Sequence, residues 1–258
     1  MAGRKKTGSV GNLYLGISNV VIPGNKTTFP PAFREKSRLH YYSSLYNSVE
    51  INSSFYKTPL RSTYEKWQAD VPNNFRFSIK LSREITHTRE LKYDPALVDP
   101  FLQAADGLGN KKGALLVQFP GKITFDYFNH VEKILEHIHA SPWQTGWDLA
   151  VEFRHPSWYM GETTELLNEY NAGLVLHDIP KSKWMEAVTA APHIYIRFHG
   201  PTGNYRDSYS PRLLAERAAE INQWRSQGKT IYAYFNNTID DAFENARSFQ
   251  RLTGLDAK

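Results

Sequence analysis

Charged side chains alternate with apolar ones in several short segments of this sequence. The clearest is DLAVEFR (148–154), in which Glu152 and Arg154 are separated by an apolar residue. In a β-strand, alternate side chains face opposite sides, so Glu152 and Arg154 share one face and the apolar residues share the other. If several such strands surround one axis, their polar faces meet in a single site.

The same alternation places further polar residues near the C-terminal ends of other apolar segments: Glu50, Asn52, Lys80, Gln118, Arg197, His199, Tyr234 and Asn236, with Ser18 and Asp178 at segment ends. Any one of them could belong to a structural network. Burying so many charges together is costly unless each is paired, so the set as a whole favours a ligand site.

The cations of this set, Lys80, Arg154 and Arg197, suit a phosphate or carboxylate, because guanidinium groups bind oxyanions bidentately. Glu50 and Glu152 are candidate general bases and His199 a candidate general acid, provided that burial brings their pKa values near neutrality. Asp178 completes the candidate catalytic residues. The residues expected to bind substrate are Lys80, Gln118, Arg154, Arg197, Tyr234, Asn236, Asn237, His87 and Trp158.

Neither a metal nor another cofactor is expected. The sequence contains no HExxH metal motif, and Lys80, Arg154 and Arg197 would repel a divalent ion at the same mouth. No GxSxG, P-loop or GxGxxG motif occurs.

The elements that must position these residues alternate along the chain. The apolar segments predicted to be strands are Leu13–Ser18, Ser48–Asn52, Arg76–Lys80, Ala114–Phe119, Asp148–Arg154, Gly173–Asp178, His193–His199 and Thr230–Asn236. Helices are predicted between them at Pro31–Leu45, Leu60–Ala69, Pro95–Leu108, Phe125–His139, Thr163–Tyr170, Lys181–Glu186, Pro211–Gln227 and Asp240–Leu252. Eight strand–helix units predict a (β/α)8 TIM barrel, with a doubly wound open sheet as the alternative.

Several connections from a strand to the next helix are long, as at Asn19–Pro30, Leu81–Tyr93 and Gly200–Ser210. In TIM barrels these loops surround the C-terminal face, where ligands bind. No linker divides the chain, so one barrel domain is predicted over residues 11–256, after a disordered tail at residues 1–10.

Composition limits the classes of function. The 258 residues include no cysteine, which excludes disulfides, thiolate metal ligands and cysteine nucleophiles. No stretch of about 18 apolar residues could span a bilayer, and a cytoplasmic protein is expected. The net charge of +5 would favour an anionic partner. Nucleic acid is therefore an alternative to a small ligand, and the oligomeric state stays open.

Six segments together resemble one known family: VEINSSFY (49–56), FRFSIKLSREITH (75–87), LLVQFP (115–120), EFRHPSW (152–158), IRFHG (196–200) and YFNN (234–237). They are similar, in order and over nearly the whole chain, to the YecE-like family, or domain of unknown function 72. The segment LGISNV (15–20) departs from the Gly-Thr-Ser-Gly-Trp-like opening of that family. The resemblance implies a TIM-barrel-like fold and no settled reaction, so function has to be argued from the site.

The sequence thus favours a metal-independent enzyme that acts on a small anionic or phosphate-bearing substrate. Two alternatives remain, a non-catalytic nucleic-acid-binding barrel and a carbohydrate-active hydrolase. The hydrolase would use Glu50 and Glu152 as its carboxylate pair, with aromatic loop residues such as Trp158 stacking on sugar rings. Steep loss of affinity with salt would indicate nucleic acid.

Overall fold

The fold is described by a computed structural model for residues 9–255, so most of the predicted tail lies outside the described residues. Its parallel strands form two sheets. The first has the order β1-β9-β8-β7, with β1 (Leu13–Ile17), β9 (Thr230–Phe235), β8 (His193–Phe198) and β7 (Leu176–His177). The second has the order β2-β3-β4-β5-β6, with β2 (Ser48–Ile51), β3 (Arg76–Lys80), β4 (Lys112–Phe119), β5 (Asp148–Phe153) and β6 (Gly173–Leu174).

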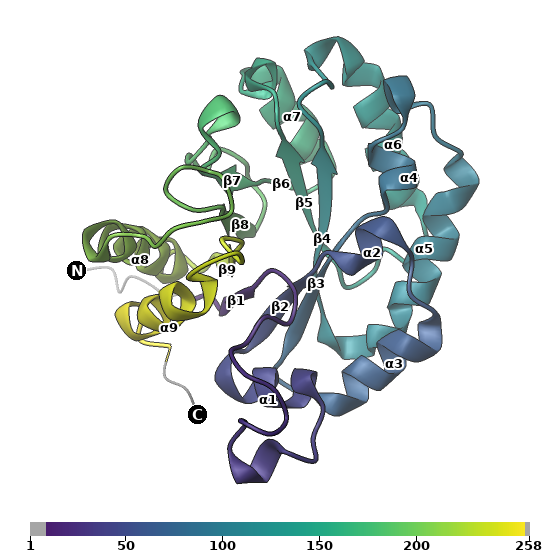
Figure 1. Ribbon diagram of the computed structural model, residues 1–258. Coiled ribbons are helices and arrows are strands. Elements are labelled where there is room, and N and C mark those ends of the chain that lie inside the picture. Colours follow the sequence, from purple (N-terminus) through teal and green to yellow (C-terminus); the bar gives the residue numbers. More distant parts are fainter. Residues whose placement is uncertain (1–8, 256–258) are drawn as a thin grey trace, which may run out of the picture.

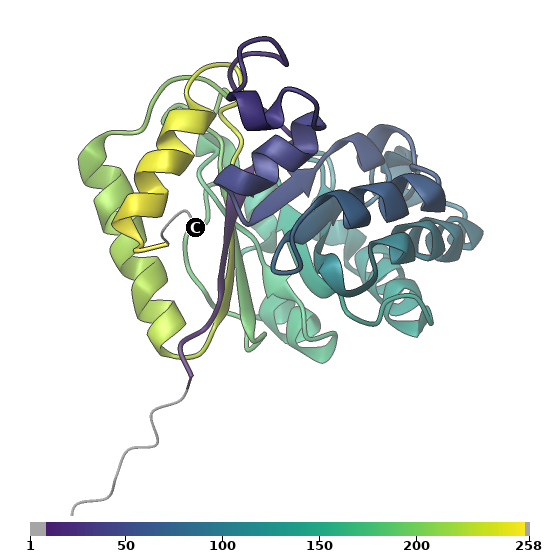
Figure 2. The same cartoon turned by 90° about the horizontal axis from the view of Figure 1, so that it is seen from below.

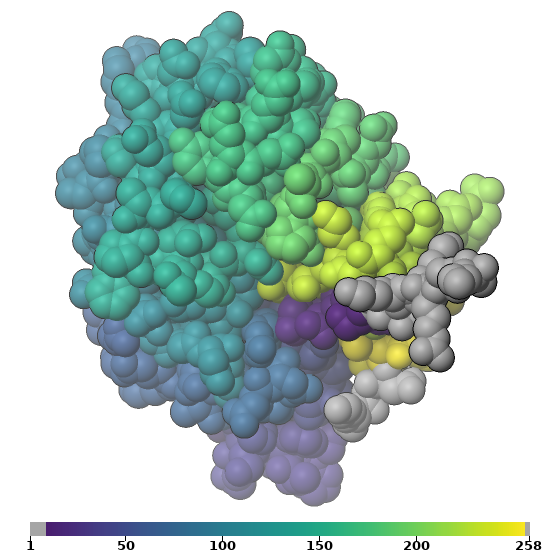
Figure 3. Space-filling model, turned by 180° about the vertical axis from the view of Figure 1, so that it is seen from behind, coloured from purple at the N-terminus to yellow at the C-terminus, as the bar shows by residue number. Residues whose placement is uncertain are grey.

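The two sheets join into one barrel at both seams. At one seam, Ser18 and Glu50 form a parallel bridge between the ends of β1 and β2. At the other, β6 and β7 are consecutive pieces of one extended segment: β6 pairs with β5 and β7 pairs with β8. Seen from behind, the first described residues, in purple, lie beside the yellow C-terminal elements, in line with the pairing of β1 and β9 (Figure 3). The predicted TIM barrel is confirmed, and its sixth strand is split at Val175.

Helices surround the barrel (Figures 1 and 2). Those that follow the strands are α1 (Arg38–Leu45), α3 (Arg61–Asp70), α5 (Val98–Ala105), α6 (Phe128–Ala140), α7 (Gly161–Glu169), α8 (Pro211–Ser226) and α9 (Ala242–Leu252). Two single-turn helices, α2 (Ser53–Tyr56) and α4 (Arg83–Thr86), lie in the loops directly after β2 and β3. No helix within residues 9–255 is long and apolar enough to cross a membrane.

The helix predicted at Lys181–Glu186 is wrong. A 3-10 turn at Pro180–Ser182 is followed by an antiparallel bridge, in which the backbones of His177 and Trp184 exchange hydrogen bonds of 2.7 and 3.0 Å. Pairing with β7 therefore overrides the local helical pattern. The helix predicted from Pro31 begins instead at Arg38, where the Ser37 hydroxyl accepts a hydrogen bond from the backbone N–H of His40.

Side chains on the two faces of the strands form two apolar layers. The outer layer packs between strands and helices and includes Val49, Phe77, Val117 and Val151. The inner layer fills the barrel and contains Ala114, Leu116, Ala150, Val175, Tyr195, Tyr232 and Tyr234. The predicted alternation is therefore confirmed, and the inner layer forms the base on which the polar strand ends rest.

Candidate functional site

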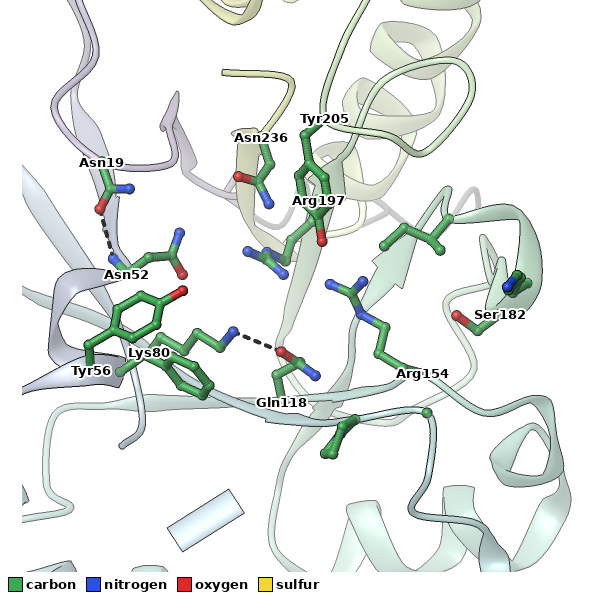
Figure 4. Close-up of a pocket in the computed structure, with 15 residues that line it drawn as sticks. Asn19, Asn52, Tyr56, Lys80, Gln118, Arg154, Ser182, Arg197, Tyr205 and Asn236 are labelled. Carbon is green, nitrogen blue, oxygen red and sulfur yellow. Dashed lines mark hydrogen bonds between the residues drawn. The ribbon is translucent and has the colours of Figure 1, made fainter. Parts of the chain in front are cut away.

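A cavity of about 590 Å³ opens at the C-terminal ends of the strands (Figure 4). Five of the residues predicted to bind substrate line it: Lys80, Gln118, Arg154, Arg197 and Asn236. The other lining residues are Asn19, Asn52, Phe55, Tyr56, Pro120, Gly121, Ile179, Lys181, Ser182 and Tyr205. This volume suits a small-molecule ligand.

Arg197 is the centre of a buried ionic network under the cavity. Its Nε and Nη2 donate to the two carboxylate oxygens of Glu50 at 2.9 and 2.8 Å. Its Nη1 donates to Glu152 at 2.8 Å, and the other carboxylate oxygen of Glu152 accepts from Arg154 Nε. Both glutamates are fully buried, and Arg197 is 2% exposed. The network thus uses two of the three predicted cations to neutralise two carboxylates.

This pairing decides the charge of the two glutamates. Burial opposes ionisation of Glu50, but the charge and hydrogen bonds of Arg197 outweigh it and hold the pKa at about 2. For Glu152, burial is likewise outweighed by Arg154 and Arg197, so its pKa lies well below the ordinary value. The expectation that either pKa approaches neutrality is wrong, and both groups stay ionised and paired at neutral pH.

His199 does not have the environment expected of a general acid. Burial lowers its pKa to about 4, although Asp178 opposes the shift. Its Nε2 lies 3.2 Å from Arg154 Nη2, and its Nδ1 lies 3.4 Å from Asp178 Oδ1. Because a guanidinium can only donate, Nε2 must accept and the ring proton sits on Nδ1. His199 is therefore a neutral group that orients Arg154.

Asp178 anchors the loop that follows β8. Its carboxylate accepts hydrogen bonds from the backbone N–H of His199 at 2.8 Å and from the hydroxyl of Tyr209. That hydroxyl in turn accepts from the backbone N–H of Gly200 at 2.6 Å. Asp178 does not line the cavity, so these contacts give it a positioning role instead of the predicted catalytic one.

Four predicted binding residues lie outside the cavity lining, and two of them belong to the core. Trp158 is fully buried, stacks on Phe153 with ring centroids 4.1 Å apart, and donates its indole N–H to the carbonyl of Ile123 at 2.9 Å. Tyr234 lies in the inner apolar layer, where its hydroxyl contacts Ser48 and Ser78 at 2.5 and 2.8 Å.

The other two residues, Asn237 and His87, support loops beside the cavity. Asn237 is buried and donates to the carbonyl of Asp207 at 2.7 Å and to Asn245 Oδ1 at 3.1 Å. His87 packs edge-on against Phe55, and burial, followed by the charge of Lys80, lowers its pKa to about 4. These contacts therefore indicate a supporting role, and not direct binding of a ligand, for Trp158, Tyr234, Asn237 and His87.

The residues predicted to bind substrate did not include several others that line the cavity. Asn52, Phe55 and Tyr56 come immediately after β2, and Tyr205 lies in the loop after β8. The Nδ2 of Asn52 donates to Glu50 at 2.9 Å, and its buried Oδ1 has no hydrogen-bond partner within residues 9–255. For Asn52, Phe55 and Tyr56, the available signal was their position directly after the strand that carries Glu50.

Lys80 and Arg154 keep donors that face the cavity (Figure 4). Lys80 Nζ donates to Gln118 Oε1 at 2.7 Å and lies 4.0 Å from the centroid of the Phe55 ring. Burial, with the nearby charge of Arg197, lowers its pKa to about 8. In Arg154, Nη1 has no hydrogen-bond partner in the described part of the chain.

Comparison with known proteins agrees with this architecture. A family model described as "Protein of unknown function DUF72" matches residues 14–258. The UPF0759 protein YunF of Bacillus subtilis is 24% identical over 290 residues, with 95% of each chain covered. Crystal structures of DUF72 family proteins from Enterococcus faecalis and Thermotoga maritima give TM-scores of 0.77 and 0.74, each at 23% identity. The alignment with the Enterococcus faecalis structure covers 95% of this chain and 96% of that one. The alignment with the Thermotoga maritima structure covers 94% of this chain and 99% of that one.

Proposed function

This chain belongs to the DUF72 family, whose description assigns no activity, and we propose from the cavity itself that it is an enzyme acting on a small anionic or phosphate-bearing substrate. The observation that carries the proposal is the charge of the lining. Among the described residues, the cavity lining contains four cations, Lys80, Arg154, Lys181 and Arg197, and no acidic residue.

The two nearest carboxylates cancel only the part of this charge that Arg154 and Arg197 carry, and among the described residues Lys80 and Lys181 form no ion pair. Glu50 and Glu152 lie beneath the lining and already accept hydrogen bonds from Arg197 and Arg154. Lys80 has only the neutral amide oxygen of Gln118 as its hydrogen-bond acceptor within residues 9–255. An anion between Lys80 and Arg154 would meet two charge-assisted donors, which are among the strongest hydrogen bonds in proteins.

An enzymatic role is supported by the position and chemistry of the cavity. It lies at the C-terminal face of the barrel, where TIM-barrel enzymes carry their active sites. A lysine with a perturbed pKa in a cleft is also a mark of functional sites. A metal-independent reaction is proposed because no group of three or more His, Asp or Glu side chains within residues 9–255 is arranged to hold an ion, and the lining is cationic.

The geometry favours this proposal over glycoside hydrolysis. Hydrolysis needs one carboxyl group that is protonated near neutral pH and a second that faces the substrate. Burial raises the pKa of Glu50 and Glu152, but their arginine partners lower both values well below neutrality, and both side chains are fully buried. Nucleic-acid binding is separated from small-anion binding by the experiment below.

Calorimetric titration with inorganic phosphate, at constant ionic strength set with chloride, tests the proposal. We expect saturable binding to the wild-type chain and affinity at least about tenfold lower in Arg154→Gln, because a charge-assisted hydrogen bond contributes roughly 1.5–3 kcal/mol. Arg61→Gln is the matched control, since Arg61 also pairs with carboxylates but lies outside the lining. Its affinity should equal that of the wild type.

Two outcomes would contradict the proposal. The first is phosphate binding that Arg154→Gln and Arg61→Gln weaken equally, because the anion would then not occupy this cavity. The second is no phosphate binding together with binding of a single-stranded oligonucleotide whose affinity falls steeply with salt. That result would favour the nucleic-acid alternative.

A further inference from the structure

The ammonium of Lys80, a partly buried lysine, differs in its contacts from those of buried Lys111 and partly buried Lys112. Lys111 Nζ donates to two backbone carbonyls, those of Gln68 and Val71, both at 2.6 Å. Lys112 Nζ forms an ion pair with Asp106 at 2.7 Å. Lys80 Nζ has no acidic group within 4 Å among residues 9–255, and it opens into the cavity. The first two lysines are structural, whereas the Lys80 ammonium retains two N–H groups that have no partner in the described part of the chain.

The surroundings of Lys80 make the neutral amine more accessible than it is in a solvent-exposed lysine. The Phe55 ring, whose centroid is 4.0 Å from Nζ, shields one side of Lys80 from water, although its face also attracts a cation. Glu152 and Glu50 favour the ammonium, but both are ion-paired with arginines, and Arg197 and Arg154 place positive charge near Lys80. Burial and these arginines lower the pKa of Lys80 to about 8, so about one molecule in ten carries the free amine at pH 7.

We propose that Lys80 is the nucleophile of this site and forms an imine with a small carbonyl compound that carries a carboxylate or phosphate group. The inference rests on the proposed function, because Arg154 and the other cations of the lining would hold the anionic group. It goes further by naming the attacking atom, Lys80 Nζ, and the functional group that the substrate must contain. A desolvated lysine close to other cations is an established way to activate an amine.

The step balances without an oxidant or reductant. The lone pair of Nζ adds to the carbonyl carbon, and the carbonyl oxygen leaves as water with the two protons of the amine. A C=N bond thereby replaces the C=O bond. A proton from solvent converts the imine to an iminium ion, which withdraws electrons from the adjacent carbon. The class of reaction that follows is proton removal, or the making or breaking of a carbon–carbon bond, next to the original carbonyl.

Reductive trapping tests the inference on the wild-type chain. The protein is incubated with cyanoborohydride and either pyruvate or dihydroxyacetone phosphate, and then digested with trypsin. A reduced adduct on Lys80 blocks cleavage there, so the peptide FSIKLSR (77–83) appears with the mass of the added group. Acetone serves as the neutral carbonyl probe. Lys111 and Lys112 are internal controls for buried lysines, and Lys181 is the control for a lysine at the same mouth.

We expect an adduct on Lys80 with at least one anionic probe, about tenfold or more above that on Lys181, and little with acetone. Excess phosphate should compete with it. Lys80→Arg, checked for folding by circular dichroism, should lack the adduct. The pyruvate and dihydroxyacetone phosphate arms distinguish a carboxylate from a phosphate substrate.

The outcomes separate this inference from the proposed function. Phosphate binding that depends on Arg154, with no adduct on Lys80 from either probe, would overturn the imine and leave the anion site standing. Adducts spread equally over Lys80 and Lys181 would also overturn it, because they would reflect general lysine reactivity. An adduct on Lys80 that forms equally with acetone would overturn the anionic character of the substrate.

Discussion

Replacing Arg197 with methionine should unbalance the most buried charges of the protein. Arg197 donates to Glu50 through two nitrogens and to Glu152 through a third. Methionine fills a comparable apolar volume and donates nothing. Glu152 would keep Arg154, while Glu50 would keep only neutral donors, the hydroxyls of Ser18 and Tyr195 and the amide of Asn52. The variant therefore leaves one fully buried carboxylate without a cation.

The magnitude follows from the pKa of Glu50. Burial alone would raise this pKa, and Arg197 instead holds it at about 2, against an ordinary 4.5. That difference corresponds to about 3 kcal/mol of stability at neutral pH. Removing one partner of a buried ion pair typically costs about 3–5 kcal/mol. We expect Arg197→Met to lower the free energy of unfolding at pH 7 by this amount, a large part of a total of roughly 5–15 kcal/mol.

The stability difference between the wild type and Arg197→Met should depend on pH. In the wild type, the contribution of Glu50 is complete above pH 4.5 and is lost as the pH falls through about 2. In the variant, burial is no longer opposed, so the pKa of Glu50 rises and acidification protonates the carboxylate and relieves the penalty. The stability difference between wild type and variant should therefore shrink from pH 7.5 to pH 5.

Urea unfolding at both pH values measures this difference. Arg61→Met is the matched control, because Arg61 forms partly exposed ion pairs with Glu65 and Asp106, and such pairs contribute about 1 kcal/mol or less. A loss below about 1 kcal/mol in Arg197→Met, or an equal loss at both pH values, would refute the view that Arg197 neutralises the buried carboxylates.

Three further results are expected. Lys80→Met should raise the free energy of unfolding at pH 7 by about 3 kcal/mol, because burial and Arg197 lower the pKa of Lys80 from 10.5 to about 8. The unfolded chain binds the extra proton between those values, so the gain should fade by pH 10.5. Urea unfolding that shows a less stable variant at both pH values would contradict this. Trp158→Ala should lower the free energy of unfolding by about 3–5 kcal/mol in the same assay but leave phosphate affinity unchanged in calorimetry. Weakened phosphate binding in a folded variant would support the prediction from sequence that Trp158 contacts the substrate. Tyr209→Phe removes the hydroxyl that links Asp178 to Gly200, so the rate of hydrogen exchange at the Gly200 amide should increase. An unchanged rate would mean that other contacts hold this loop.

The barrel was predictable from the sequence because strand periodicity is a local property. In DLAVEFR (148–154), the alternation alone places Glu152 on the axis side and Val151 on the helix side, and burial in two separate layers bears this out. The exception was Lys181–Glu186, whose helical composition yields to backbone pairing between Trp184 and His177. No local sequence pattern predicts that pairing.

The site was predicted in position more accurately than in chemistry. Polar residues at consecutive strand ends had to converge, and six of them line one cavity. The sequence did not reveal that Arg197 would reach Glu50 and Glu152 at once, because that depends on side-chain conformations across the barrel. It also did not reveal that the turn at Pro156–Trp158 directs Trp158 inward onto Phe153.

A crystal structure of the protein grown with phosphate is the most direct test of the central claim, that the cavity is an anion site. We predict phosphate density in the cavity, with oxygens about 3 Å from Arg154 Nη1 and Lys80 Nζ and with the ion pairs of Arg197 unchanged. The claim would be contradicted if, at saturating phosphate, the cavity held only water while phosphate occupied other surfaces of the molecule.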